Sequence, residues 1–337
     1  MNKISLHKHS SFFVNANAKT HNTSQFGVLA IVVASFLWGT TGTAAQFAPS
    51  ISPLAIGAFA MGTAGVLLCV FAYKQLMRDL NLLKRNPIVF LLGALCVSIY
   101  PLAFYSSMRL SGVAIGTVVS IASAPLFAAV LEFVIGKKPV SKTWVISFCF
   151  GATGVVFLSM GKSELLNSAP SVASTNIAFS SITSYANERV WGIVLGLIAG
   201  LTYAGYSFSA KYFINNGVNS KSAMASLFGA ASLLLLPSLL FSGDKLFISP
   251  TNAAVSVYMA IIPMFLGYML FGYGLKTVEA SRATLITLIE PLVATLFAIL
   301  LIGETFKLIG WLGMFFVCVC LFIQTVRWPQ ARPFSNN

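Results

Sequence analysis

The sequence predicts an all-α integral membrane protein whose ten transmembrane helices form two inverted repeats of five helices. Three observations support this prediction: the composition, the number of long apolar runs, and a duplication within the chain. Hydrophobic residues make up 57% of the 337 residues and charged residues only 9%, whereas soluble domains carry about 25% charged residues. The composition therefore indicates a membrane protein.

Ten apolar runs are long enough to cross a bilayer. A helix rises about 1.5 Å per residue, so about 20 apolar residues span the hydrocarbon core. The runs cover residues 26–47, 53–73, 88–108, 113–136, 143–161, 190–210, 222–242, 254–275, 280–302 and 308–326. The polar residues 1–25 lack the apolar core and cleavage site of a signal peptide, so we expect a cytoplasmic tail and a retained first span.

Lysine and arginine are distributed unevenly between the two sides of these spans. With the N-terminal tail inside, sixteen of the 21 basic residues fall in inside segments and five in outside segments. This bias follows the positive-inside rule, so both tails (1–25 and 328–337) should be cytoplasmic in a multi-pass protein of the bacterial inner (plasma) membrane. The net charge of +13 thus reports topology, and the basic loops are expected to contact lipid headgroups, with no nucleic-acid partner.

The positions of histidine and cysteine exclude several kinds of site. All three histidines lie in the N-terminal tail, so a histidine proton relay or an imidazole metal site within the membrane is excluded. All five cysteines lie inside spans, where they are expected to pack as small apolar residues. We therefore predict no metal and no cofactor. No Walker A motif is present, so we expect no ATP-hydrolysing site of the P-loop type in the chain.

The two halves of the chain resemble each other across a Ser-, Asn- and Thr-rich loop. This loop, 162–188, is expected to be a periplasmic linker between repeats at 26–161 and 189–327. Aligning the halves sets Trp38 on Tyr203 and Pro125 on Pro291. Each repeat has an odd number of spans, so the second must run inverted, which places a substrate site near the midplane between the repeats.

Several short motifs occur in the order of a known family. They are Trp38-Gly39, Phe104-Tyr105 with Leu110-Ser-Gly-Val-Ala114 and Pro125, and Leu275-Lys276 with Ala280, Glu290-Pro291 and Gly303-Glu304. The chain resembles the EamA-type transporters of the drug/metabolite transporter superfamily. This resemblance implies a helical bundle with a central cavity and transport of small metabolites, often amino acids leaving the cell. The first repeat has Gly136-Lys137-Lys138 where the family usually shows an acid, so a coupling or gating role is carried over to Glu304 only.

Glu290 is the candidate for substrate binding and for coupling. It lies near the middle of the run 280–302, where an ionised carboxylate costs several kcal/mol unless it is paired or faces water. Pro291 should bend the helix beside it, and Pro125 and Pro291 are candidate hinges for gating. The alternative is a buried, protonated acid with a structural role only.

The aromatic candidates for substrate binding are Trp38, Tyr203, Tyr206 and Tyr268. Trp38 lies in mid-span, where its indole N–H needs a partner, and Tyr203 is its repeat mate. Core packing is the alternative for each of them. Tyr268 belongs with Tyr100, Tyr105 and Tyr273 to a weaker group of candidates, for which packing is favoured. The other tryptophans, Trp144, Trp191, Trp311 and Trp328, lie at span ends and are expected in the interfacial aromatic belt.

Glu132 is the second acid within a span, close to the expected cytoplasmic end. Lys137 and Lys138 follow it, so the favoured interpretation is an interfacial acid that pairs with lysine.

These observations favour a secondary transporter that exports small metabolites by alternating access. A nutrient importer, for a vitamin or a quaternary amine held by an aromatic cage at Trp38 and Tyr203, is the alternative. A membrane-embedded lipid enzyme is disfavoured because the spans lack histidine and their acids are scattered. The expected partners are a small-molecule substrate and the bilayer, and a homodimer is left open.

Overall fold

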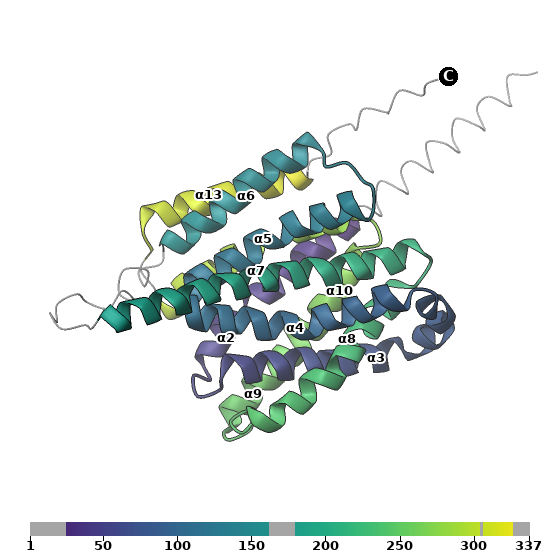
Figure 1. Cartoon of the computed structure of the whole chain (residues 1–337), viewed down its shortest axis with the longest axis horizontal. Helices are drawn as coiled ribbons and strands as arrows, with labels where there is room; N and C mark the ends of the chain where they lie inside the picture. The colour runs from purple at the N-terminus through teal and green to yellow at the C-terminus, as the bar shows by residue number, and fades with distance from the viewer. Residues whose placement is uncertain (1–24, 162–178, 304–305, 326–337) are drawn as a thin grey trace, which may run out of the picture.

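The computed structural model describes residues 25–161, 179–303 and 306–325 (Figure 1). The described residues are helical, without a strand, and contain the ten predicted helices that are long and apolar enough to cross a membrane. These spans are Gln25–Gln46, Pro53–Lys84, Pro87–Ser111, Ile115–Val134, Lys142–Gly161, Asn187–Asn215, Ser220–Phe241, Pro250–Gly274, Ala280–Leu301 and Leu308–Thr325. Glu304, Trp328, both tails and most of the central linker lie outside the described residues.

The first repeat consists of a helix at residues 25–39, followed by α2 (Thr41–Gln46), α3 (Pro53–Lys84), α4 (Pro87–Ser111), α5 (Val113–Val134) and α6 (Lys142–Gly161). The second repeat consists of α7 (Phe179–Asn215), α8 (Ser220–Ser238) with the 3₁₀ turn η2 (Leu239–Phe241), α9 (Pro250–Met259), the π-helical turn η3 (Ala260–Leu266), α10 (Gly267–Gly274), α11 (Ala280–Ile286), α12 (Ile289–Phe297), the π-helical turn η4 (Ala298–Ile302) and α13 (Leu308–Thr325).

Local sequence explains where several helices begin. Proline opens α3 and α9, where its missing N–H costs nothing, and the preceding Ser52 and Ser249 cap these helices with their side chains. Gly112 separates α4 from α5 with φ of 88°, a conformation that glycine adopts without strain. The chain can therefore reverse direction between two long helices within a single residue.

The two repeats pack as intertwined halves of one bundle. Equivalent helices lie side by side: α3 packs along α8, α6 along α13, and α5 against α11. In Figure 1, α6 and α13 form one edge of the bundle and α3 and α8 lie toward the other, with α4, α5 and α7 between them. This pairing of equivalent elements is the arrangement that inverted repeats produce, so the predicted fold class is confirmed.

Three of the described spans are interrupted within their length, and the ninth of them also contains η4 close to its end. The first span breaks at Thr40, the eighth contains η3 with Pro263 inside it, and the ninth breaks at residues 287–288. Non-helical backbone at membrane depth is tolerated where it lines a cavity or is buried in protein. The ninth span breaks three residues before Pro291, and the bend expected at that proline stays a prediction. Pro125 lies within an uninterrupted α5.

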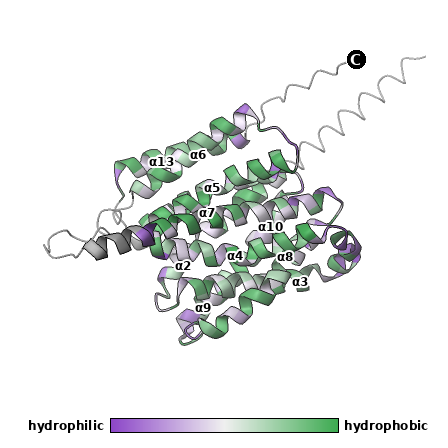
Figure 2. Ribbon diagram, in the orientation of Figure 1, coloured by the Kyte–Doolittle hydropathy of each residue, from purple (hydrophilic) through white to green (hydrophobic). Residues whose placement is uncertain are grey.

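The outward faces of the bundle are apolar. Large hydrophobic side chains such as Leu91, Phe133 and Leu233 are exposed, and Figure 2 shows hydrophobic residues along the length of the outer helices. Helices that are hydrophobic on all sides are typical of membrane spans. The described part of the chain is therefore a multi-pass membrane bundle.

Candidate functional site

A cavity of about 40 Å³ lies where the interrupted spans meet α3, α4 and α7. Trp38, Tyr203, Tyr206, Tyr268 and Glu290 line it, so the five predicted binding residues converge there. The other lining residues are Thr41, Gly57, Met61, Tyr100, Pro101, Phe104, Tyr105 and Met264. A few water molecules fill such a volume, whereas ligand pockets usually measure several hundred Å³. A ligand of metabolite size therefore requires the helices to move apart.

Trp38 is fixed by the breaks in two spans. Its indole Nε1 donates a 2.9 Å hydrogen bond to the carbonyl oxygen of Pro263 inside η3. Gly267 leaves room for the indole, because a Cβ at Gly267 would lie 2.6 Å from Nε1. At the first-span break, the Thr41 hydroxyl donates to the Trp38 carbonyl oxygen at 2.7 Å. The indole N–H is thus satisfied by the protein, and the aromatic face of Trp38 remains for the cavity.

Aromatic rings from both repeats surround the cavity. The ring centroids of Trp38 and Tyr268 lie 4.9 Å apart, those of Tyr203 and Tyr206 5.2 Å apart, and those of Tyr100 and Tyr203 5.5 Å apart. The repeat mates Trp38 and Tyr203 meet edge to face at 6.5 Å. Such stacked, tilted and edge-on pairs are favourable, so the rings form one connected wall.

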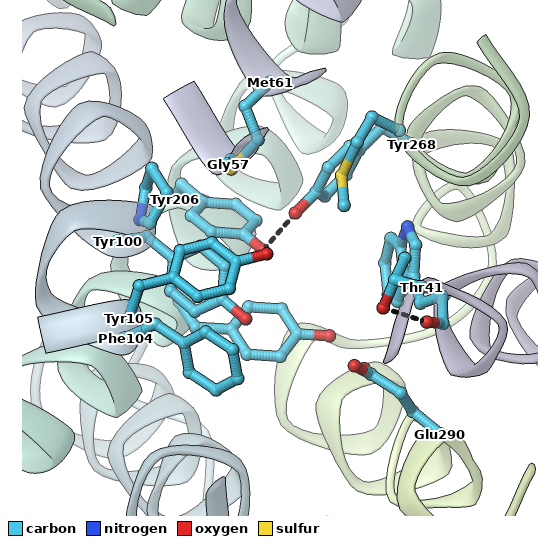
Figure 3. A pocket seen from close by; sticks show the side chains of 13 residues that line it. Thr41, Gly57, Met61, Tyr100, Phe104, Tyr105, Tyr206, Tyr268 and Glu290 are labelled. Carbon is cyan, nitrogen blue, oxygen red and sulfur yellow. Dashed lines mark hydrogen bonds between the residues drawn. The ribbon is translucent and has the colours of Figure 1, made fainter. Parts of the chain in front are cut away.

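The tyrosine hydroxyl groups fall into two sets. The Tyr203 hydroxyl donates to Thr287 Oγ1 at 2.9 Å, and the hydroxyls of Tyr206 and Tyr268 lie 3.2 Å apart. By contrast, no hydrogen-bond partner for the Tyr100 or Tyr105 hydroxyl occurs within residues 25–161, 179–303 and 306–325. These two hydroxyls face the cavity (Figure 3), so they remain available to a ligand.

Glu290 lies opposite the tyrosines and points into the cavity (Figure 3). The break at residues 287–288 places it in the first turn of α12, where the partial positive charge of a helix N-terminus stabilises a carboxylate. No hydrogen bond or cation within 4 Å of its carboxylate is found among the residues that the structure covers. Glu290 is therefore a partly exposed acid at mid-span without a counter-charge, which is a functional-site signature in membrane proteins.

The Trp38-Gly39 motif has a steric explanation at the same place. A Cβ on Gly39 would lie 2.6 Å from Val293 Cβ and 2.9 Å from the Glu290 carbonyl oxygen. Only glycine lets the first span approach α12 this closely. The motif thus combines a cavity side chain with the contact that positions the Glu290 helix.

The remaining predicted residues lie elsewhere. Neither Pro125 nor Pro291 lines the cavity, and their gating roles remain predictions. Tyr273 is 44% exposed on α10 and lies beneath the Lys276 ammonium, away from the cavity. Tyr100 and Tyr105, which sequence reasoning assigned to packing, belong to the lining. Pro101, between them in α4, lines the cavity as well.

The expected pairing of Glu132 with Lys137 and Lys138 is wrong. Glu132 is 8% exposed and accepts hydrogen bonds from Ser281 N at 3.1 Å and from Ser281 Oγ at 2.5 Å. It therefore caps the N-terminus of α11 from the neighbouring α5. The reason is the face of α5 on which Glu132 lies: its side chain points into the bundle, whereas Lys137 and Lys138 come after the last residue of α5. Trp144 also differs from a belt residue, since its ring is buried and its N–H donates to Ser281 O at 3.3 Å.

An ionic cluster lies beside this cap. Lys138 forms a 2.8 Å ion pair with Glu279, and Glu279 lies 3.9 Å from the buried Lys211. Lys211 also donates to the Leu275 carbonyl oxygen at 2.8 Å, at the end of α10. These contacts join the loop after α5 to the second repeat at the end of the bundle predicted to be cytoplasmic. No group of histidine, cysteine or acidic side chains suited to a metal ion occurs in the described ranges.

The sequence and the fold are similar to those of known proteins over most of the chain. A model of the EamA-like transporter family matches residues 25–160 and again residues 190–325. The uncharacterized transporter YwfM of Bacillus subtilis (strain 168) is 32% identical over 292 residues, covering 85% of this chain and 89% of YwfM. Protein PecM of Dickeya dadantii (strain 3937) is 26% identical over 289 residues, covering 85% and 88%. One solved structure, described only as the crystal structure of a protein, has a TM-score of 0.68 at 15% identity, covering 88% of this chain and 95% of that one, and so shares the fold.

Proposed function

Because the chain belongs to the EamA-like transporter family and is therefore a membrane transporter, we propose that it is a proton-coupled secondary transporter. It exports small metabolites such as amino acids across the bacterial inner membrane by alternating access. Both termini lie in the cytoplasm in this proposal, as the distribution of basic residues predicts. The two repeats rock about the cavity between them, and the breaks in three spans provide the points at which helices bend.

The observation that carries the proposal is the solitary carboxyl group of Glu290 in the cavity between the repeats. A charged carboxylate in a medium of low dielectric constant needs water, a cation or a proton to compensate its charge. Access from the outer side lets Glu290 take a proton, and access from the inner side lets it release that proton. If substrate can occupy the cavity only while Glu290 carries no proton, each inward movement of a proton is exchanged for an outward movement of substrate.

Liposomes that contain the purified protein and an internal pH indicator test this proposal. Each of the twenty amino acids, together with choline as a quaternary amine, is offered against a pH gradient. We expect at least one solute to dissipate the gradient with the unmodified protein. Glu290→Gln should abolish this exchange, because glutamine keeps the size and much of the hydrogen bonding of the acid but cannot ionise.

A matched control removes a negative charge outside the cavity. Asp244 lies in an exposed loop between α8 and α9, so Asp244→Asn should leave the exchange unchanged. Equal pH-driven exchange by the unmodified protein and by Glu290→Gln would show that Glu290 is a structural acid. The proposed coupling would then be wrong.

A further inference from the structure

We propose that the end of α3 and the start of α8 form a binding site for the headgroup of an anionic phospholipid. Basic loops in general attract anionic membranes through a diffuse electrostatic field. This site is instead a defined set of cations held by both repeats, because α3 belongs to the first repeat and α8 to the second. None of its residues lines the cavity, so the site does not depend on the substrate or on the direction of transport.

α3 is longer than a bilayer requires. Its 32 residues, Pro53–Lys84, measure about 48 Å at 1.5 Å per residue, whereas the hydrocarbon core is about 30 Å thick. The apolar run predicted at 53–73 ends at Tyr73, an exposed aromatic residue of the kind that favours the membrane–water interface. The last turns of α3 therefore lie at the level of the lipid headgroups, and Figure 2 shows hydrophilic residues where α3 ends.

These last turns are fixed to the rest of the bundle. Leu83 is buried. Asp79 Oδ2 accepts a 2.9 Å hydrogen bond from Asn219 N, at the cap of α8. The Tyr212 hydroxyl of α7 donates to Asn86 Oδ1 at 3.2 Å. The one acid of the segment 71–86 is thus bonded to the second repeat, and the segment presents a fixed outer face.

The outer face carries a stripe of cations. Lys74, Arg78 and Arg85 are exposed. They follow Phe71 at steps of three, four and seven residues, a spacing that places them on one side of a helix. From the second repeat, the Lys221 ammonium lies 4.5 Å from the centroid of the Phe71 ring. The start of α8 therefore adds a fourth cation to the same stripe.

The protein itself does not neutralise these four cations. Within residues 25–161, 179–303 and 306–325, no acid lies within 4 Å of any of them. By contrast, Lys138 and Lys211 both lie within 4 Å of Glu279. A lipid phosphate supplies the missing negative charge, and an arginine can bind a phosphate through two parallel hydrogen bonds.

Exposed apolar side chains adjoin the cations and identify the source of the phosphate. Val70, Tyr73 and Met77 are 70%, 62% and 44% exposed. Each of them precedes a member of the stripe by one residue. A phospholipid matches this pairing, because its charged headgroup is joined to apolar chains, whereas a free phosphate ion would leave the apolar side chains in water. The occupant is therefore a lipid.

Native mass spectrometry of the purified protein in a neutral detergent counts bound lipids and gives their affinity. We expect one tightly bound phosphatidylglycerol, and phosphatidylcholine, whose net charge is zero, should bind at least roughly tenfold more weakly. Each cation near anionic lipid contributes about fivefold in affinity. Lys74→Gln, Arg78→Gln and Lys221→Gln combined should therefore weaken phosphatidylglycerol binding about a hundredfold. The charge-conserving combination of Lys74→Arg, Arg78→Lys and Lys221→Arg should retain binding.

A matched control removes the same charge elsewhere at the end of the bundle predicted to be cytoplasmic. Lys137, Lys142 and Lys276 are exposed and lie outside the stripe. Their combined replacement by glutamine should lower the affinity by less than about threefold, because salt screens a diffuse field. If the triple variant of the stripe does not fold, Arg78→Gln should lose about fivefold in affinity and Lys137→Gln should lose none.

Three results would overturn the proposal. Equal loss of binding in the stripe variant and in the matched control would show diffuse attraction only. Equal affinity for phosphatidylglycerol and phosphatidylcholine would show that the stripe does not recognise negative charge. Displacement of the bound lipid by excess inorganic phosphate would show a site for free anions in place of a lipid site.

Discussion

The cap that Glu132 places on α11 can be tested by its contribution to stability. Glu132→Ala removes the acceptor for both Ser281 N and Ser281 Oγ, at 3.1 Å and 2.5 Å. A hydrogen bond to a charged group contributes about 1.5–3 kcal/mol, and a helix cap about 1 kcal/mol. Water that enters the gap can hydrogen-bond the groups of Ser281 and so offsets part of this loss. We therefore expect the free energy of unfolding to fall by about 3 kcal/mol. Ser281→Ala loses only the hydroxyl bond and should cost about 1.5 kcal/mol.

The free energy of unfolding is measured by titrating the purified protein in mixed micelles with a denaturing detergent, and tryptophan fluorescence monitors the unfolding. Because the two residues share a bond, the double variant should cost about 3 kcal/mol, so the coupling energy is about 1.5 kcal/mol. Glu132→Gln keeps one acceptor oxygen and should be intermediate. A loss below about 1 kcal/mol for Glu132→Ala would refute the cap. Coupling to Lys138→Ala in place of Ser281→Ala would favour the lysine pair instead.

Two further predictions concern topology and the close helix contact. Cysteine labelling from outside should reach Ser174→Cys and miss Ser141→Cys, and the reverse pattern would contradict the proposed orientation of both termini. Gly39→Val should reduce transport at least tenfold in a liposome flux assay, because its Cβ would lie 2.6 Å from Val293 Cβ. The control Gly42→Val should be tolerated, since a Cβ at Gly42 has no neighbour within 4 Å. Equal loss of transport in both variants would show that the contact between Gly39 and Val293 is not specific.

The candidate site was predictable where a residue type conflicts with its position. Glu290 and Trp38 are polar groups at mid-span, and burial of a polar group demands a partner, so each stands out in the sequence. Tyr203 followed from the repeat alignment with Trp38, and the structure places the two rings edge to face at 6.5 Å. Tyr100 and Tyr105 carried no such conflict, because a tyrosine in a span also packs well against its neighbours.

The sequence by itself determined the helical membrane architecture. Backbone groups in lipid must be satisfied within each segment, so long apolar runs have to be helices, and an odd number of spans in each repeat requires inversion. Partners far apart in the chain were decided only by tertiary structure. Lys137 and Lys138 are near Glu132 in sequence, but the inward face of α5 brings its carboxylate to Ser281. Likewise, the partner of the Trp38 N–H is a carbonyl 225 residues away, in η3. Helix packing sets such contacts, and no local pattern in the chain encodes them.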